Sequence, residues 1–219
     1  MMKKKSLIVM AVALCLVFAM GAGATLATLS RQSQQVTNTF TVGDGFRADA
    51  ITLDEAPVDP DTHEADEGAA RVRENTYTGI MQGDVLDKDP QVHIAANSAA
   101  CYMFVKIEGL DALAAAGITA DWNAENWVKV DVPEGKLDGI YAYQASGETA
   151  PSIIPRSTSV TDLAKLFTEL NVADTATLYN QDGTPVSLDA IKIMACAVQS
   201  DNQENGYTSA LASATFSIQ

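Results

Sequence analysis

Short apolar segments of strand length recur along the chain, and they restrict its fold more than any other feature. The strongest is 101–107, which is rich in aromatic and β-branched residues. Residues 36–42 and 128–132 alternate in polarity, which is the period of a half-buried strand. Weaker candidates are 50–53, 92–94, 140–143, 176–179 and 190–198. Because Gly, Pro and Asp-Gly turns separate these segments, the sequence predicts an all-β fold of the β-sandwich class.

Two segments favour short inserted helices instead. Residues 111–116 are rich in alanine and end at Gly117, a common helix C-terminal signal. Residues 161–170 repeat apolar side chains at helical spacing, which predicts a second helix; these are Leu163, Leu166, Phe167 and Leu170. The tail, 207–218, is ambiguous, because its first half favours helix and its second half favours strand.

The N-terminus has the order of a secretory signal peptide. Three lysines, Lys3 to Lys5, precede an apolar run over 7–20 and then the small residues 21–24. We expect cleavage between Ala27 and Thr28, with cleavage after Ala24 as the alternative. The prediction is therefore a signal peptide over 1–27 and one secreted β-sandwich domain over 28–219, which keeps no membrane span after cleavage. A retained anchor is the other interpretation, although the apolar run is shorter than the roughly 20 residues of a typical span.

The chain is strongly acidic, with a formal net charge of −14. Removal of residues 1–27 would take away three lysines and no acidic residue, and would change that charge to −17. Such a charge repels nucleic acid and anionic membranes, so neither is expected as a partner. Acidic residues, proline and glycine gather in 54–75, which predicts an exposed acidic loop.

Two cysteines, Cys101 and Cys196, remain after the predicted cleavage. Both lie in strand-like runs, and an oxidising compartment permits a disulfide between them. Two buried free thiols are the alternative, and spacing in the sequence does not decide between the two.

Motifs for catalysis are weak. The segment that begins His63-Glu64 and ends at Glu67 has a carboxylate where a zinc-protease helix carries its second histidine, and Pro60 and Gly68 bracket it. The other histidine, His93, stands alone between two apolar residues. Nucleophile motifs and phosphate-binding loops are absent from the sequence. We therefore predict no enzymatic activity, no metal and no cofactor.

Several segments together resemble one known family. They are the lysine-rich signal that ends in 21–27, the strand 36–42, and the motifs at 51–55, 83–92 and 97–107. This combination is similar to the TasA and camelysin family of Gram-positive bacteria, whose signal peptides are processed by the dedicated peptidase SipW. The resemblance covers residues 1–108 and becomes loose over 109–219. It implies a jelly-roll-like β-sandwich with inserted helices, processing by a signal peptidase during export, and a role in biofilm matrix fibres.

The function expected from this resemblance is that of a secreted structural protein of the cell surface or biofilm matrix. Residues 28–35 would be a free N-terminal donor segment after cleavage, so that one subunit adds a strand to the next and fibres form by self-association. The assembly residues would be Leu29, Val36, Phe40 and Val42. One alternative is a camelysin-like metal-dependent peptidase that uses His63, Glu64, Glu67 and His93. Another is a monomeric cell-surface adhesin that binds through the acidic loop.

Overall fold

Ten strands and two short helices form the part of the chain that the computed structural model describes, residues 46, 47, 49–188 and 190–216. These residues belong to one compact unit, Gly43–Gln219, whereas a second unit, Met1–Val42, lies outside them. The predicted cleavage site and the four predicted assembly residues also lie outside the described residues.

The strands form three antiparallel sheets, with the orders β1-β3-β8, β10-β4-β7-β6 and β2-β9-β5. The prediction of an all-β fold with one or two short helices is therefore confirmed. In chain order the elements are β1 (Ile51–Asp54), β2 (Val85–Asp87), β3 (Gln91–Ile94), β4 (Cys101–Glu108), α2 (Leu110–Ala116), β5 (Ile118–Ala120), β6 (Trp127–Asp131), β7 (Gly139–Tyr143), β8 (Thr161–Asp162), β9 (Glu169–Val172), β10 (Lys192–Gln199) and α3 (Tyr207–Ser213).

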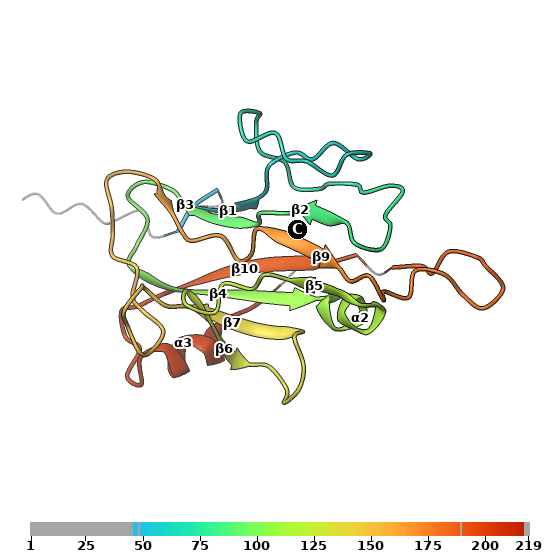
Figure 1. Ribbon diagram of the computed structural model, residues 1–219. Helices are drawn as coiled ribbons and strands as arrows, with labels where there is room; N and C mark the ends of the chain where they lie inside the picture. The colour runs from blue at the N-terminus through green and yellow to red at the C-terminus, as the bar shows by residue number, and fades with distance from the viewer. Residues whose placement is uncertain (1–45, 48, 189, 217–219) are drawn as a thin grey trace, which may run out of the picture. The chain divides into compact units, whose positions relative to one another are not determined.

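Strand β4 is the centre of the core because it is buried on both faces. Met103, Val105 and Ile107 point into the main core, together with side chains of the two three-stranded sheets. The alternate residues Tyr102 and Phe104 point to the opposite face. The period of two along a strand accounts for this division. β1, β3, β2 and β9 lie above β10, β4, β7 and β6 in Figure 1, which gives the two layers of the predicted sandwich.

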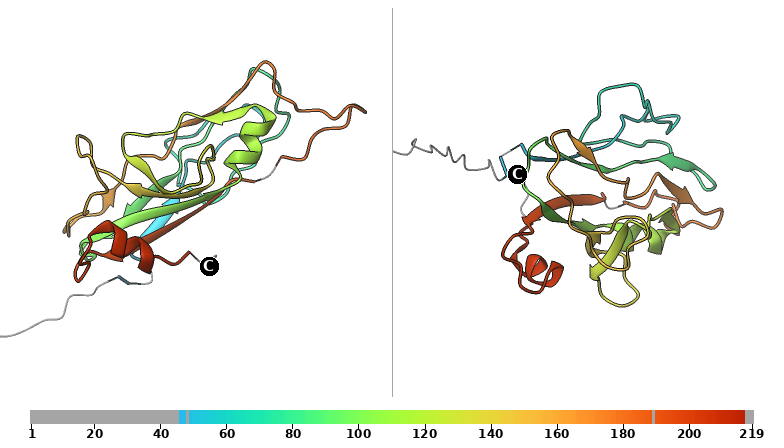
Figure 2. Two further views of the ribbon diagram at one scale, coloured as in Figure 1. Left: turned by 90° about the horizontal axis from the view of Figure 1, so that it is seen from below. Right: turned by 90° about the vertical axis from the view of Figure 1, so that its left-hand side faces the viewer.

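The short helix α3 covers part of the outer face of the four-stranded sheet. It contacts β4 and β10, and its buried Ala210 packs with Tyr102 and Phe104. Figure 2 shows α3 on the side of this sheet that faces away from the other layer. The chain becomes extended at Ala214, so the helix-then-extended character of the tail is present in the fold. Across the described residues, none of the helices combines the length and the apolar character that a membrane crossing requires.

One helix prediction is confirmed and the other is wrong. Helix α2 ends before Gly117, which adopts the left-handed conformation (φ 89°). Gly117 also lies close to Ala176, because a Cβ atom on Gly117 would be 2.9 Å from the Cα atom of Ala176. Residues 161–170, however, contain β8, a connection and the start of β9. The apolar side chains of this segment are buried, but its backbone groups bond to other segments. Leu163 N–H donates to Val92, and the Trp127 indole donates to the Ala164 carbonyl.

The two cysteines lie on opposite faces of the β4–β10 ladder. Cys196 pairs in register with Phe104, and Cys101 pairs with Gln199. Directly paired residues share a face of a sheet, so Cys196 shares the face of Phe104, whereas Cys101 faces the main core. Both are free thiols. Of the two alternatives that the sequence left open, a disulfide and two free thiols, the structure has the two free thiols.

Native thiol reactivity should be low. Burial raises the pKa of Cys101 to about 12, and burial also raises the pKa of Cys196 despite an opposing hydrogen bond from the Thr215 backbone. Because the thiolate is the reactive form, iodoacetamide at about pH 8 should leave the folded chain 28–219 unmodified, whereas the chain unfolded in urea should take up two labels. Mass spectrometry measures both states. Rapid labelling of Cys101 in the folded chain would contradict this burial.

Candidate functional site

A groove separates two strand edges that lack a strand partner on one side. β1 is the terminal strand of its sheet and pairs with β3, and β10 is the terminal strand of its sheet and pairs with β4. Within the described residues, no strand pairs with the other edge of either one. The groove between them has a volume of about 960 Å³ and is partly open to solvent.

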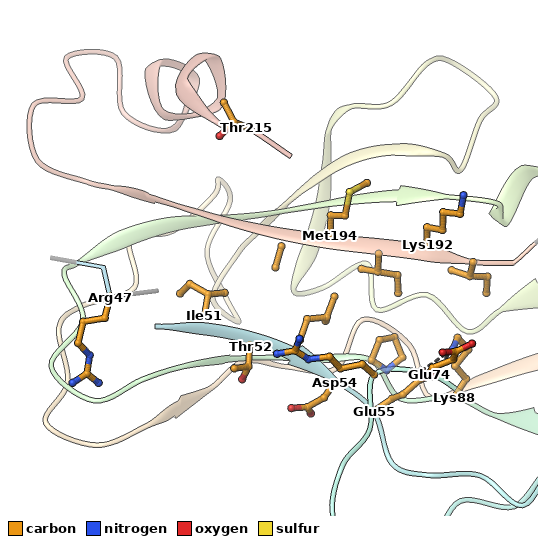
Figure 3. A pocket seen from close by; sticks show the side chains of 16 residues that line it. Arg47, Ile51, Thr52, Asp54, Glu55, Glu74, Lys88, Lys192, Met194 and Thr215 are labelled. Carbon is orange, nitrogen blue, oxygen red and sulfur yellow. Dashed lines mark hydrogen bonds and ion pairs between the residues drawn. The ribbon is translucent and has the colours of Figure 1, made fainter. Parts of the chain in front are cut away.

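The floor of the groove is apolar. Ile51 and Leu53 pair in register with Ile94 and Val92, two buried residues of β3, and so share their inward face. On β10, Ile193 and Ala195 pair with Ile107 and Val105, and they point into the core for the same reason. Figure 3 shows Ile51 directed towards β10, whereas Thr52 and Asp54 point away from it.

Charged side chains line the rest of the groove. Arg47 lies near the start of β1, whereas the acidic and basic side chains at the other end of the groove come from four different segments of the chain (Figure 3). These are Asp54, Glu55, Arg73, Glu74, Lys88 and Lys192. Glu55 and Lys88 form an ion pair at 2.7 Å with side chains only 8 and 13% exposed. The groove therefore has an apolar floor and a mixed-charge rim.

This arrangement suits an extended peptide. Unpaired edge strands present rows of backbone N–H and C=O groups, which bind an added strand through main-chain hydrogen bonds. β1 and β10 approach within 8 Å in Cα separation along part of their length, which is less than two strand spacings, so an added strand would pair with the free edge of one of them. Its alternate side chains would point to the apolar floor, and the others would point to solvent.

An ionic network holds the end of β1, one side of the groove, in place. Asp54, the last residue of β1, accepts a hydrogen bond from Arg71 Nε at 2.5 Å, and Arg71 Nη1 donates to Asp89 at 2.9 Å. Asp89 also binds Lys165 at 2.9 Å and accepts the Ala56 N–H at 2.7 Å. Burial would raise the pKa of Asp89, but the hydrogen bonds from Lys165, Ala56 and Arg71 outweigh burial and hold this pKa below its ordinary value.

The predicted acidic loop over 54–75 is built of turns and isolated bridges that follow β1. Glu55 bridges Val72, and Val58 bridges Ala65. Asp59 accepts the backbone N–H groups of Thr62 and Asp61, and these bonds lower the pKa of its carboxyl group. Most of the carboxylates of this loop are exposed, so the acidic surface that the sequence predicts is present.

The residues of the alternative peptidase site have separate partners. His63 is buried, and its Nε2 lies 2.7 Å from the Thr78 carbonyl oxygen. Glu67 pairs with Lys165, whereas His93 contacts Asp54 and Asp162. Among the described residues, no group of three or more His, Cys, Asp or Glu side chains is arranged to hold a metal ion. These histidines and glutamates are therefore not brought together as a ligand set.

Comparison of the chain with protein-family models, with curated proteins and with solved structures finds no match. The similarity to the TasA and camelysin family therefore stays a prediction from the sequence motifs. The observation that carries functional information is the groove between β1 and β10.

Proposed function

We propose that this chain is a secreted structural subunit of a cell-surface or biofilm matrix fibre, and that it assembles by strand addition. The observation that supports this proposal is the groove between β1 and β10, which has a strand edge on each side and an apolar floor. The occupant is the N-terminal segment of a second copy of the chain.

The chemistry of that segment supports its role as donor. An extended strand over residues 36–42 would place Val36, Asn38, Phe40 and Val42 on one face, which is apolar except for Asn38, and three threonines on the other. The apolar face matches the floor of the groove, and threonine suits the solvent side of a strand. The preceding residues, 28–35, are mainly polar and keep the donor soluble before it binds.

Strand addition between copies produces filaments when the contact is head to tail. The donor segment and the acceptor groove are different surfaces of one chain, so each bound subunit leaves one donor and one acceptor free. A heterologous contact of this kind that does not close into a ring continues without limit. If the segment instead enters the groove of its own chain, the product is a closed monomer.

Electron microscopy of truncated chains tests the proposal. We expect the chain 28–219 to form regular filaments after concentration, and we expect a chain that begins at Val36 to assemble less well, because it lacks Leu29 and the polar residues that precede the strand. A chain that begins at Gly43 should remain monomeric, since it lacks the donor. Circular dichroism should give the same β signal for all three chains, because the described core lies wholly after Gly43.

Two results would contradict the proposal. If the chain that begins at Gly43 forms the same filaments as 28–219, the N-terminal segment is not the donor and the proposal fails. If 28–219 stays monomeric and the addition of a synthetic 28–42 peptide produces no binding to the chain that begins at Gly43, the groove is not a strand acceptor.

A further inference from the structure

Alternate residues of β10 turn their backbone groups away from β4. Cys101, which pairs with Gln199 at the end of this ladder, exchanges both of its backbone hydrogen bonds with Ile154 on its other side. Paired residues of an antiparallel ladder alternate between bonded and non-bonded pairs, so every second residue of β10, counted back from Gln199, faces the free edge. The Gln203 side chain already donates to the Gln199 carbonyl. The free edge that remains consists of Ile193, Ala195 and Ala197, and within the described residues no other backbone group bonds to it.

The free edge of β1 is shorter and is closed at one end. The Ala50 carbonyl bonds to the chain that follows β3, so by the same alternation Ile51 and Leu53 turn their backbone groups away from β3. The next residue on that edge, Glu55, exchanges both of its backbone hydrogen bonds with Val72. An added strand could therefore pair with only two residues of β1 before it met Val72.

The proposed donor strand fits the longer of the two edges. Residues 36–42 are a run of seven, whereas β10 has eight residues and β1 has four. The side chains of β10 from Ile193 to Val198 are only partly buried, although its partner β4 is almost wholly buried. A strand paired with β10 would cover part of this remaining surface.

The layers of the sandwich decide what an added strand would contact. β1 and β10 belong to different layers (Figure 1), so a strand paired with β10 extends the four-stranded sheet and faces Ile51 and Leu53 across the groove. Ala195 also lines the groove, and its small side chain leaves space for a larger donor residue such as Phe40. The donor can thus take its backbone hydrogen bonds from one layer and its apolar contacts from both.

We infer that β10 is the acceptor edge, and that the donor strand of a second copy becomes the fifth strand of the sheet β10-β4-β7-β6. This assignment rests on the proposed assembly by strand addition, and it names the side of the groove that pairs. Ile193, Ala195 and Ala197 supply the backbone hydrogen bonds to the donor. β1 contributes apolar side chains to the floor and no backbone hydrogen bonds to the donor.

Amide hydrogen exchange tests this assignment in the unaltered chain 28–219. Exchange is measured in filaments and in a dilute monomer, and is then quenched and read at single-residue resolution. The amides of Ile193, Ala195 and Ala197 gain acceptors only in the filament, so they should exchange there about tenfold more slowly or less. The amides of Ile51 and Leu53, the internal control on β1, should keep their monomer rates.

A proline on the free edge gives an independent reading. Ala195→Pro removes one N–H that faces the donor and places the proline ring there, which a free edge tolerates but a paired strand does not. It should raise the protein concentration needed for filament growth by about tenfold or more, because backbone pairing is lost. Ala195→Gly, which keeps the N–H, is the matched control and should change that concentration by less than about threefold. Urea unfolding of both variants checks that the fold is intact.

The failure of this assignment and the failure of strand addition give different results. Filaments in which exchange slows at Ile51 and Leu53 but not on β10 would overturn the assignment and leave strand addition standing. Assembly of folded Ala195→Pro at the concentration of the unaltered chain would do the same. If the unaltered chain forms no filaments at all, the proposed function fails and the assignment fails with it. Should Ala195→Pro not fold, the exchange rates of the unaltered chain still decide between the two edges.

Discussion

Replacement of Phe40 by serine should raise the protein concentration needed for filament growth by about tenfold or more. A phenylalanine that moves from water to an apolar site contributes about 1.5–3 kcal/mol, and 1.4 kcal/mol corresponds to a factor of ten. In the proposed complex, Phe40 would be the largest side chain that reaches the floor made by Ile51, Leu53 and Ile193. Pelleting of filaments across a concentration series measures the effect.

The matched control is Thr39→Ser, on the face of the donor strand that would point to solvent. It should change the critical concentration by less than about threefold, because surface substitutions usually alter free energies by less than about 0.5 kcal/mol. The folding stability of both variants should equal that of the unaltered chain, since the described core does not include the segment. Equal assembly of Phe40→Ser and Thr39→Ser would rule out insertion of this face into the groove.

Replacement of Asp89 by alanine should destabilise the fold by about 3–5 kcal/mol, the usual cost of removing one partner from a buried ionic network. Asp89 is 4% exposed, and its loss leaves Arg71 and Lys165 without their shared carboxylate and the Ala56 N–H without an acceptor. Urea unfolding followed by tryptophan fluorescence gives the change in free energy. Asp49→Ala provides the control, because its pair with Arg47 is exposed and contributes only about 0–1 kcal/mol.

The same carboxylate predicts a pH dependence. The pKa of Asp89 is lower in the folded chain than its ordinary value, so its contribution is fully present above about pH 4 and is lost as pH falls through the folded value. The unaltered chain should therefore lose stability between about pH 4 and pH 2 more steeply than the Asp89→Ala variant. Parallel acid-unfolding curves for the two chains would show that Asp89 is not stabilised in this way.

The local sequence pattern was sufficient to predict most of the longer strands. The segments around β1, β3, β4, β6, β7 and β10 carry enough apolar and β-branched residues to be recognised as strands, and α2 ends at its predicted glycine. The prediction of a helix over 161–170 was wrong because an extended segment that crosses the core can bury Leu163, Leu166 and Phe167 as well as a helix can. Backbone hydrogen bonds to Val92 and Pro90 decide between the two, and these partners are distant in sequence.

The candidate site was beyond prediction from the sequence for a related reason. The positions of β1 and β10 as terminal strands depend on which strands pair, and pairing involves residues far apart along the chain. The same holds for His93, whose two carboxylate partners lie 39 and 69 residues away. No local motif surrounds His93, so the sequence offered a lone histidine between two apolar residues. The network around Asp89 likewise joins residues that show no common pattern.

The pairing of β4 with β10 has a consequence for the order in which the chain folds. It joins Cys101 to Gln199, a separation of nearly half the 219 residues. Closing a loop of this length is slow compared with forming a hairpin, so one edge of β4 stays unpaired until the last part of the chain is available, whereas its other edge can pair earlier with β7. Until then the unpaired edge of β4 can add strands of other chains, and the interval before β10 arrives carries a risk of aggregation.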